Sequence, residues 1–174
     1  MHIPRHQSHL GFTLIEVLIA LGIMVVITTL SLVDFRTADS QSASNFGAQL
    51  LVSDLRSVAL KALGGERFQG KTPGGWGVYF EEDSNQYIIF ADLDNDRNYD
   101  FKEKYKAVAL DSGIKISWQN YSIGSLVFNE SDAKPYAAGL PVNSGAGDVV
   151  IVLKNSAGAE IKSIFVNPAG AVNF

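Results

Sequence analysis

The sequence contains no cysteine, and its three histidines, His2, His6 and His9, all lie within the first nine residues. A chain without cysteine has no disulfide, no thiol nucleophile and no zinc–thiolate centre. From residue 12 onward histidine is also absent, so that part of the chain has no Ser-His chemistry and no histidine metal ligands. The composition therefore disfavours an enzyme and favours a structural or binding role.

Basic residues are also in the minority. Lys plus Arg number 14 against 18 Asp plus Glu, for a formal net charge of −4. Arg5 is the only one of these charged residues in the first eleven positions, so residues 12–174 carry 13 − 18 = −5. An acidic chain is a poor candidate for broad nucleic-acid binding, which depends on phosphate neutralisation.

One long apolar run, Phe12 to Val33, has Glu16 as its single charge. A helix of this length reaches about 33 Å, enough to cross a bilayer core of about 30 Å. We expect residues 12–33 to form a single-pass transmembrane and assembly helix. Positive charge before the run favours a cytoplasmic position for residues 1–11.

The position of Glu16 needs an explanation, because a charge within a membrane helix costs roughly 2.5–3.5 kcal/mol. No Lys, Arg or His lies between Phe12 and Arg36 to neutralise it. Cleavage after Gly11 would create a cationic α-amine on Phe12, and a second copy packed alongside would place that amine against Glu16. Glu16 is then a register device for helix bundling. A plain membrane anchor leaves Glu16 unexplained, and a secretory signal peptide is cut after its apolar region rather than before it.

The motif Gly11-Phe12-Thr13-Leu14-Ile15-Glu16 resembles the processing site of type IV pilins and type II secretion pseudopilins. The resemblance implies that residues 1–11 are a leader, that prepilin peptidase cleaves between Gly11 and Phe12, and that Phe12 is N-methylated. It also implies that Glu16 pairs with the N-terminus of a neighbouring pilin in a helical filament. Such subunits start in the bacterial inner membrane, with the head outside the cytoplasm. They meet an assembly platform there and then enter a pilus or pseudopilus.

Residues 34–64 predict an amphipathic continuation of the same helix, which Gly64-Gly65 would end. Residues 65–174 predict a β-rich head. The fold class we expect is α+β, with a long N-terminal helix packed on an antiparallel, sandwich-like head.

About seven short strands are expected in the head. We predict three hairpins, 77–80 with 87–90, 107–110 with 114–118, and 148–153 with 161–166. Leu126–Phe128 and Ala171–Phe174 are further short strands, and Asn129–Gly147 is expected to be a surface loop.

The order of these elements resembles the minor pseudopilin H family, also called the FimT-like group. The resemblance includes Phe46-x-x-x-Leu50-Leu51 on the helix, Gly75-Trp76-Gly77-Val78 opening the sheet, an Asp-rich loop and a closing strand pair. It implies a minor subunit and leaves open whether the machine is a pilus or a secretion system.

The Asp-rich loop runs from Asp92 to Glu103 and is called the aspartate loop below. Oxygen-bearing side chains fall at its positions 1, 3, 5, 7, 9 and 12, a spacing similar to that of a calcium-binding EF-hand loop. The candidate calcium ligands are Asp92, Asp94, Asp96, Asn98, Asp100 and Glu103. Two features depart from that pattern, because Arg97 replaces the usual glycine and the flanks read as strands. A solvated acidic turn, neutralised by Arg97, Lys102, Lys104 and Lys106, remains the alternative.

The sequence leaves three candidate functions for this protein. The first is a structural minor pilin or pseudopilin. The second is a pilus-tip binding module for DNA uptake or adhesion. In FimT-like relatives DNA binding is associated with C-terminal arginines, but residues 167–174 here contain no basic residue, so nucleic-acid binding is not expected. The third is an enzyme, which is disfavoured because the chain has no cysteine and no histidine from residue 12 onward.

Overall fold

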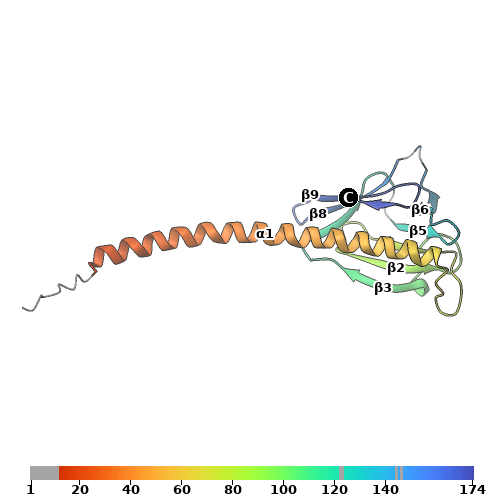
Figure 1. The fold of residues 1–174 in the computed structure, drawn as a ribbon, viewed down its shortest axis with the longest axis horizontal. Coiled ribbons are helices and arrows are strands. Elements are labelled where there is room, and N and C mark those ends of the chain that lie inside the picture. The colour runs from red at the N-terminus through yellow and green to blue at the C-terminus, as the bar shows by residue number, and fades with distance from the viewer. Residues whose placement is uncertain (1–11, 122–123, 144, 146) are drawn as a thin grey trace, which may run out of the picture. The chain divides into compact units, whose positions relative to one another are not determined.

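The computed structural model describes residues 12–121, 124–143, 145 and 147–174; the side chains of residues 30–44 are not described. The chain divides into two compact units, Met1–Ser40 and Gln41–Phe174, which we describe separately. Figure 1 shows the helix and the strands in sequence colours. The division falls within the segment 34–64 that we expect to continue the helix.

Helix α1 spans Leu14–Leu63. It begins after Thr13, whose hydroxyl oxygen lies 3.3 Å from the backbone nitrogen of Glu16 and accepts its N–H. This is the bond that an N-cap threonine makes to the third helical residue. The helix ends at Leu63 and is followed by Gly65, where φ is +59°. There the N–H of Glu66 donates to the Lys61 carbonyl at 3.0 Å and that of Gly65 to the Ala62 carbonyl at 3.1 Å, the paired bonds of a Schellman motif.

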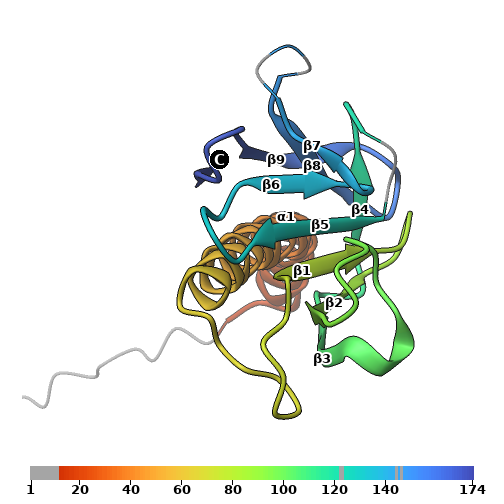
Figure 2. The ribbon, with the colours of Figure 1, turned by 90° about the vertical axis from the view of Figure 1, so that its right-hand side faces the viewer.

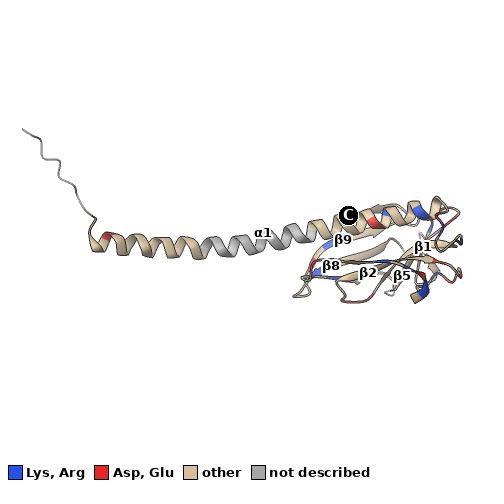
Figure 3. Cartoon of the chain, turned by 90° about the horizontal axis from the view of Figure 1, so that it is seen from below, with Lys and Arg blue, Asp and Glu red and all other residues tan. Residues whose placement is uncertain are grey.

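In the first unit, every described side chain of the helix is exposed, and most of these side chains are apolar. Figure 3 shows this part of α1 in tan with one acidic position near its start. Among the residues described, no helix meets the length and hydropathy needed to cross a bilayer. The expected span 12–33 extends beyond residue 29, after which the side chains are not described.

The second unit contains two antiparallel sheets, as expected from the sequence. A six-stranded sheet has the order β3-β2-β1-β5-β6-β7, and a four-stranded sheet has the order β10-β9-β8-β4. Figure 2 shows β1, β5 and β6 side by side and β8 and β9 above them. The strand bounds are β1 Gly75–Phe80, β2 Gln86–Asp92, β3 Lys104–Ala109, β4 Ile114–Trp118, β5 Ser125–Asn129, β6 Pro135–Ala137, β7 Leu140–Pro141, β8 Val149–Asn155, β9 Glu160–Val166 and β10 Val172–Asn173.

Two of the three expected hairpins are confirmed, β1 with β2 and β8 with β9. The second expected hairpin is wrong. β3 pairs with β2 in the large sheet, whereas β4 pairs with β8 in the small one. The turn at Asp111-Ser112-Gly113 therefore carries the chain from the large sheet to the small one, where the partner of β4 comes from a distant part of the sequence.

The stretch Asn129–Gly147 is also not simply a surface loop. It contains β6, which pairs with β5, and the short strand β7. Pro141 is tolerated because β7 is the edge strand of the sheet, and Pro135 is tolerated because it is the first residue of β6. With these two, the described residues contain ten strands, against about seven expected.

The C-terminal turns of α1 pack on both sheets and complete the core of the second unit. Buried helix residues recur three or four positions apart, so they share one face: Ala48, Leu51, Leu55, Val58 and Ala62. They join β residues such as Trp76, Phe80, Ile116 and Ile151 in one apolar cluster. Phe46, which belongs to the family-like helix motif, is instead 69% exposed.

Candidate functional site

The N-terminal motif lies at the start of α1. Gly11 falls outside the described residues, whereas Phe12 is 83% exposed and Glu16 is the third residue of the helix. A carboxylate in the first turn is favoured by the helix dipole. Within the part of the chain that the structure describes, Glu16 forms no ion pair. Glu16 thus has a local electrostatic role, and no described residue neutralises its charge through an ion pair.

The aspartate loop connects β2 to β3 through the 3₁₀ helix η1, Phe101–Glu103. Asp92 is the last residue of β2 and has no exposed surface, whereas Asp94 and Asp96 are exposed. One carboxylate oxygen from each of these three residues lies within 4.8 Å of the others. Three of the six predicted ligands therefore come together at one point of the surface.

The buried carboxylate of Asp92 is only half satisfied by hydrogen bonds. Its Oδ2 lies 3.1 Å from the backbone nitrogen of Arg97 and accepts that N–H. Its Oδ1 is buried and has no hydrogen-bond partner in the described part of the protein. Burial raises the pKa of Asp92 to about 6, more than the backbone N–H groups of Arg97 and Asn95 lower it, and the carboxylates of Glu103 and Asp94 add to the rise.

Glu103 lies outside the group of three. Its Oε1 accepts the N–H of Leu93 at 2.6 Å, and its Oε2 accepts the N–H of Asp100 at 3.1 Å. The side chain is buried, and burial raises its pKa against the lowering effect of these two bonds. Glu103 therefore joins the beginning of the aspartate loop to its end. Asp100 also lies outside the group of carboxylates.

Asn98, the remaining predicted ligand, takes part in a turn. Its N–H donates to Asp96 Oδ1 at 2.7 Å, and its side-chain amide donates to the Asp96 carbonyl at 3.1 Å. In the same way the N–H of Asp96 donates to Asp94 Oδ1 at 3.3 Å. Side-chain oxygens of this kind replace backbone acceptors in tight turns.

Arg97 occupies the position where an EF-hand loop has glycine, and its φ of +64° is of the kind that glycine adopts easily. Its guanidinium carbon lies 3.8 Å from the centre of the Tyr136 ring, a cation–π contact with β6. Among the described residues, no Lys or Arg forms an ion pair with Asp92, Asp94 or Asp96. The neutralisation by neighbouring cations that the acidic-turn alternative requires is therefore not made by direct ion pairs.

Ser125 is a part of this site that the sequence did not indicate. Its hydroxyl oxygen accepts the N–H of Tyr99 at 2.9 Å and so ties the aspartate loop to the start of β5. Because Tyr99 and Ser125 are far apart in sequence and meet only in the folded protein, no local pattern pointed to Ser125.

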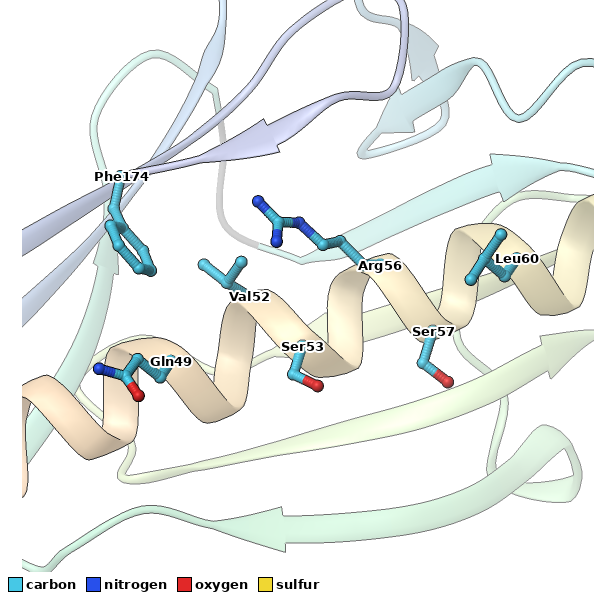
Figure 4. Close-up of a pocket in the computed structure, with 7 residues that line it drawn as sticks. All are labelled: Gln49, Val52, Ser53, Arg56, Ser57, Leu60 and Phe174. Atoms are coloured by element: carbon cyan, nitrogen blue, oxygen red, sulfur yellow. The ribbon is translucent and has the colours of Figure 1, made fainter.

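A groove of about 480 Å³ lies between one face of α1 and the C-terminal residue Phe174. Figure 4 shows Phe174 beside Val52 and Gln49, with Arg56 reaching toward the same side of the helix. Arg56 donates to the Val172 carbonyl from Nη2 at 2.7 Å and from Nε at 3.3 Å. The one charged side chain of the lining thus fastens the C-terminal strand β10 to the helix.

Comparison with known proteins agrees with the motif at the N-terminus. The family model described as the prokaryotic N-terminal methylation motif matches residues 7–32. The chain is 26% identical to the pilin-like protein PilA1 of Thermus thermophilus over 160 residues, which is 87% of this chain and 97% of that protein.

Among solved structures, the chain is similar to the minor pseudopilin EpsH from the type 2 secretion system of Vibrio cholerae. The TM-score is 0.48 at 10% sequence identity, with 74% of this chain and 93% of that chain covered. The chain is thus similar to proteins with the methylation motif over its apolar N-terminal segment, and to a pilin-like protein along most of its length.

Proposed function

We propose that this protein is a minor pilin or pseudopilin, a structural subunit that assembles through its N-terminal helix. The observation that carries the proposal is the exposed apolar start of α1, which has one carboxylate in its first turn and lies within the methylation-motif match over residues 7–32. Exposed apolar helical surface of this extent must be covered by lipid or by other such helices. A filament of packed helices meets that requirement once the subunit leaves the membrane.

Processing would supply the partner that Glu16 lacks. Cleavage between Gly11 and Phe12 by a prepilin peptidase exposes an α-amine, which is then methylated and remains a cation. In a neighbouring subunit this cation can approach Glu16 and neutralise it, which sets the register between helices. This proposal includes single-pass residence in the bacterial inner membrane, contact with an assembly platform there, and subsequent entry into the filament with other pilins.

The finer assignment is to the minor pseudopilin H (FimT-like) group of a type II secretion system or a type IV pilus. It is supported by the order of helix motif, Gly-Trp-Gly-Val strand, Asp-rich loop and closing strand pair. The alternative is a tip module for DNA uptake or adhesion, and no contact or patch among the residues that the structure describes supports it. The C-terminal residues 167–174 contain no basic side chain.

The decisive experiment is mass spectrometry of the protein purified from its native host. We expect an N-terminus at Phe12 carrying one methyl group. The variant Gly11→Leu should retain the full N-terminus and fail to enter sheared filaments, whereas Gly22→Ala, where an added Cβ meets nothing within 4 Å, should be processed normally. An intact and unmethylated N-terminus in the wild-type protein would overturn the proposal.

A further inference from the structure

The three carboxylates of the aspartate loop form a site that the filament function does not use. We propose that Asp92, Asp94 and Asp96 bind a calcium ion at the end of β2, where one oxygen from each lies within 4.8 Å of the others. This inference is independent of the proposed assembly function, because it concerns the second unit alone.

The first argument is the unpartnered oxygen of Asp92. An ionised carboxylate with no exposed surface needs hydrogen bonds or a cation to offset its lost hydration. Oδ2 receives the N–H of Arg97, while Oδ1 receives no hydrogen bond from any described residue. The same carboxylate belongs to the cluster with Asp94 and Asp96, so a bound cation would satisfy it.

The second argument is the concentration of negative charge. Carboxylates this close repel one another unless a positive charge lies between them. No Lys or Arg of the described residues makes an ion pair with any of the three. The nearest cationic residue along the chain, Arg97, instead contacts the ring of Tyr136.

The donor set selects the kind of metal. All the candidate ligands are carboxylate oxygens, which suit hard cations, and the soft or imidazole ligands favoured by zinc and copper are absent from residues 12–174. Calcium takes six to eight oxygen ligands in flexible geometry, whereas magnesium demands a near-ideal octahedron and usually binds one or two carboxylates. Asp94 and Asp96 are exposed, so water can complete the coordination sphere.

The structure also revises the predicted ligand set. Glu103 already accepts the N–H groups of Leu93 and Asp100 and so shapes the loop rather than facing the cluster. Asp100 lies outside the cluster too. The proposed site therefore contains three carboxylates, whereas the sequence predicted six ligands in an EF-hand-like loop. Fewer protein ligands predict a modest affinity for calcium.

The test uses the full chain solubilised in a mild detergent. Calorimetric titration with CaCl₂ should show one site with a Kd in the range of about 0.1–1 mM, as in extracellular calcium modules. The melting temperature of the head should rise with calcium and fall back with EDTA, and MgCl₂ should produce a smaller rise. Absence of both heat and thermal shift up to about 10 mM CaCl₂, ten times the weaker end of that range, would overturn the proposal.

The double variant Asp94→Asn/Asp96→Asn removes two charges but keeps the side-chain oxygens that accept the N–H groups of Asp96 and Asn98. It should weaken calcium binding roughly tenfold or more, because affinity in such sites follows ligand charge. The variant Asp92→Asn keeps an oxygen for the Arg97 N–H, replaces the unpartnered oxygen with an amide nitrogen, and should lose the response to calcium.

Asp111→Asn is the matched control. Asp111 is exposed and its Oδ1 accepts the N–H of Gly113 at 2.9 Å, which is the same kind of turn, located after the opposite end of β3. It should keep the wild-type calcium response and the wild-type melting temperature in EDTA. An equal calcium response in the control and in the double variant would show general charge screening and would overturn the site.

Discussion

The phenolic oxygen of Tyr87 in β2 lies 2.6 Å from Oδ2 of Asp54 in α1 and donates a hydrogen bond to it. Tyr87 is buried and Asp54 is half-buried, so this bond connects the helix to the large sheet at the edge of the core. The tyrosine ring also contacts Phe80 at a centroid distance of 5.9 Å. One side chain thus combines apolar packing with a charge-assisted hydrogen bond.

The substitution Tyr87→Phe keeps the ring and removes the hydroxyl. We expect the free energy of unfolding to fall by about 1–2 kcal/mol, since a hydrogen bond to a charged group contributes more than a neutral one but Asp54 is still reached by water. Urea denaturation of the detergent-solubilised protein measures this. Tyr79→Phe is the control, because Tyr79 contributes a ring stacked at 5.1 Å on Tyr99, and its stability should change by less than about 0.5 kcal/mol. Equal losses in both variants would contradict the role of the Tyr87 hydroxyl.

The same contact predicts a dependence on alkaline pH. Burial, followed by the hydrogen bond to Asp54 and its charge, raises the pKa of Tyr87 well above the ordinary value of 10.0. Below that pH the phenol is neutral in both states and stability is unaffected. Above it the unfolded chain ionises and the folded chain does not, so unfolding becomes favoured by up to about 1.4 kcal/mol per pH unit. The stability advantage of the wild type over Tyr87→Phe should therefore shrink as pH rises beyond about 10; a constant difference would contradict the shifted pKa.

Gly77 in β1 lies between two close neighbours. A Cβ added there would lie 2.7 Å from ring carbons of Phe90 and 2.9 Å from the backbone oxygen of Leu126. Since neither a buried ring nor a sheet carbonyl moves easily, Gly77→Ala should destabilise the head by about 1–3 kcal/mol. Gly47→Ala is the comparison, because its Cβ would meet only the flexible ends of two side chains, Ile114 at 3.0 Å and Leu110 at 3.7 Å. Alanine is also the better helix former by about 1 kcal/mol, so that variant should be nearly neutral; equal effects would count against the steric argument.

A substitution at Glu103 tests whether this residue stabilises the aspartate loop or binds calcium. Glu103→Gln would place an NH₂ group against one of the two N–H donors that now face the carboxylate. We expect a loss of about 1–3 kcal/mol, the cost of leaving a buried donor unsatisfied. The loss should be the same in EDTA and in calcium, because Glu103 is not among the clustered carboxylates. Glu82→Gln, at an exposed position between β1 and β2, is the control. A loss seen only with calcium present would instead make Glu103 a ligand.

The sequence predicted those features that depend on neighbouring residues. The helix end at Gly64-Gly65 and the hairpins β1–β2 and β8–β9 follow from local turn chemistry and periodicity. The separation of β3 from β4 into different sheets did not follow, since β3 pairs back with β2 and β4 pairs with β8, which lies far along the chain.

The aspartate loop shows the same limit. Spacing correctly indicated an acidic cluster, and Asp92, Asp94 and Asp96 do come together. It did not indicate that Glu103 would turn back to its own backbone, nor that Ser125 would accept the Tyr99 N–H. Spacing reports which side chains are near in sequence, whereas burial and competing donors decide what each one contacts.

The last prediction concerns the two roles open to Glu16. Its N–H is capped by Thr13 at 3.3 Å, and its carboxylate lies in the first turn, where it favours the helix locally. In the proposed filament the carboxylate also pairs with the α-amine of a neighbour. Glu16→Gln keeps the size of the side chain and removes its charge, so it should reduce assembly strongly if the neighbour's cation is the partner.

Thr13→Val distinguishes these roles, because it removes the capping hydroxyl, worth about 1 kcal/mol, and keeps the carboxylate. We expect Glu16→Gln to be cleaved at Gly11 normally yet to be depleted from sheared filaments in the native host, while Thr13→Val assembles close to the wild-type level. Mass spectrometry of the membrane fraction checks cleavage in both. If the two variants were depleted equally, helix initiation would explain the requirement for this segment, and the pairing of Glu16 with a neighbouring amine would be wrong.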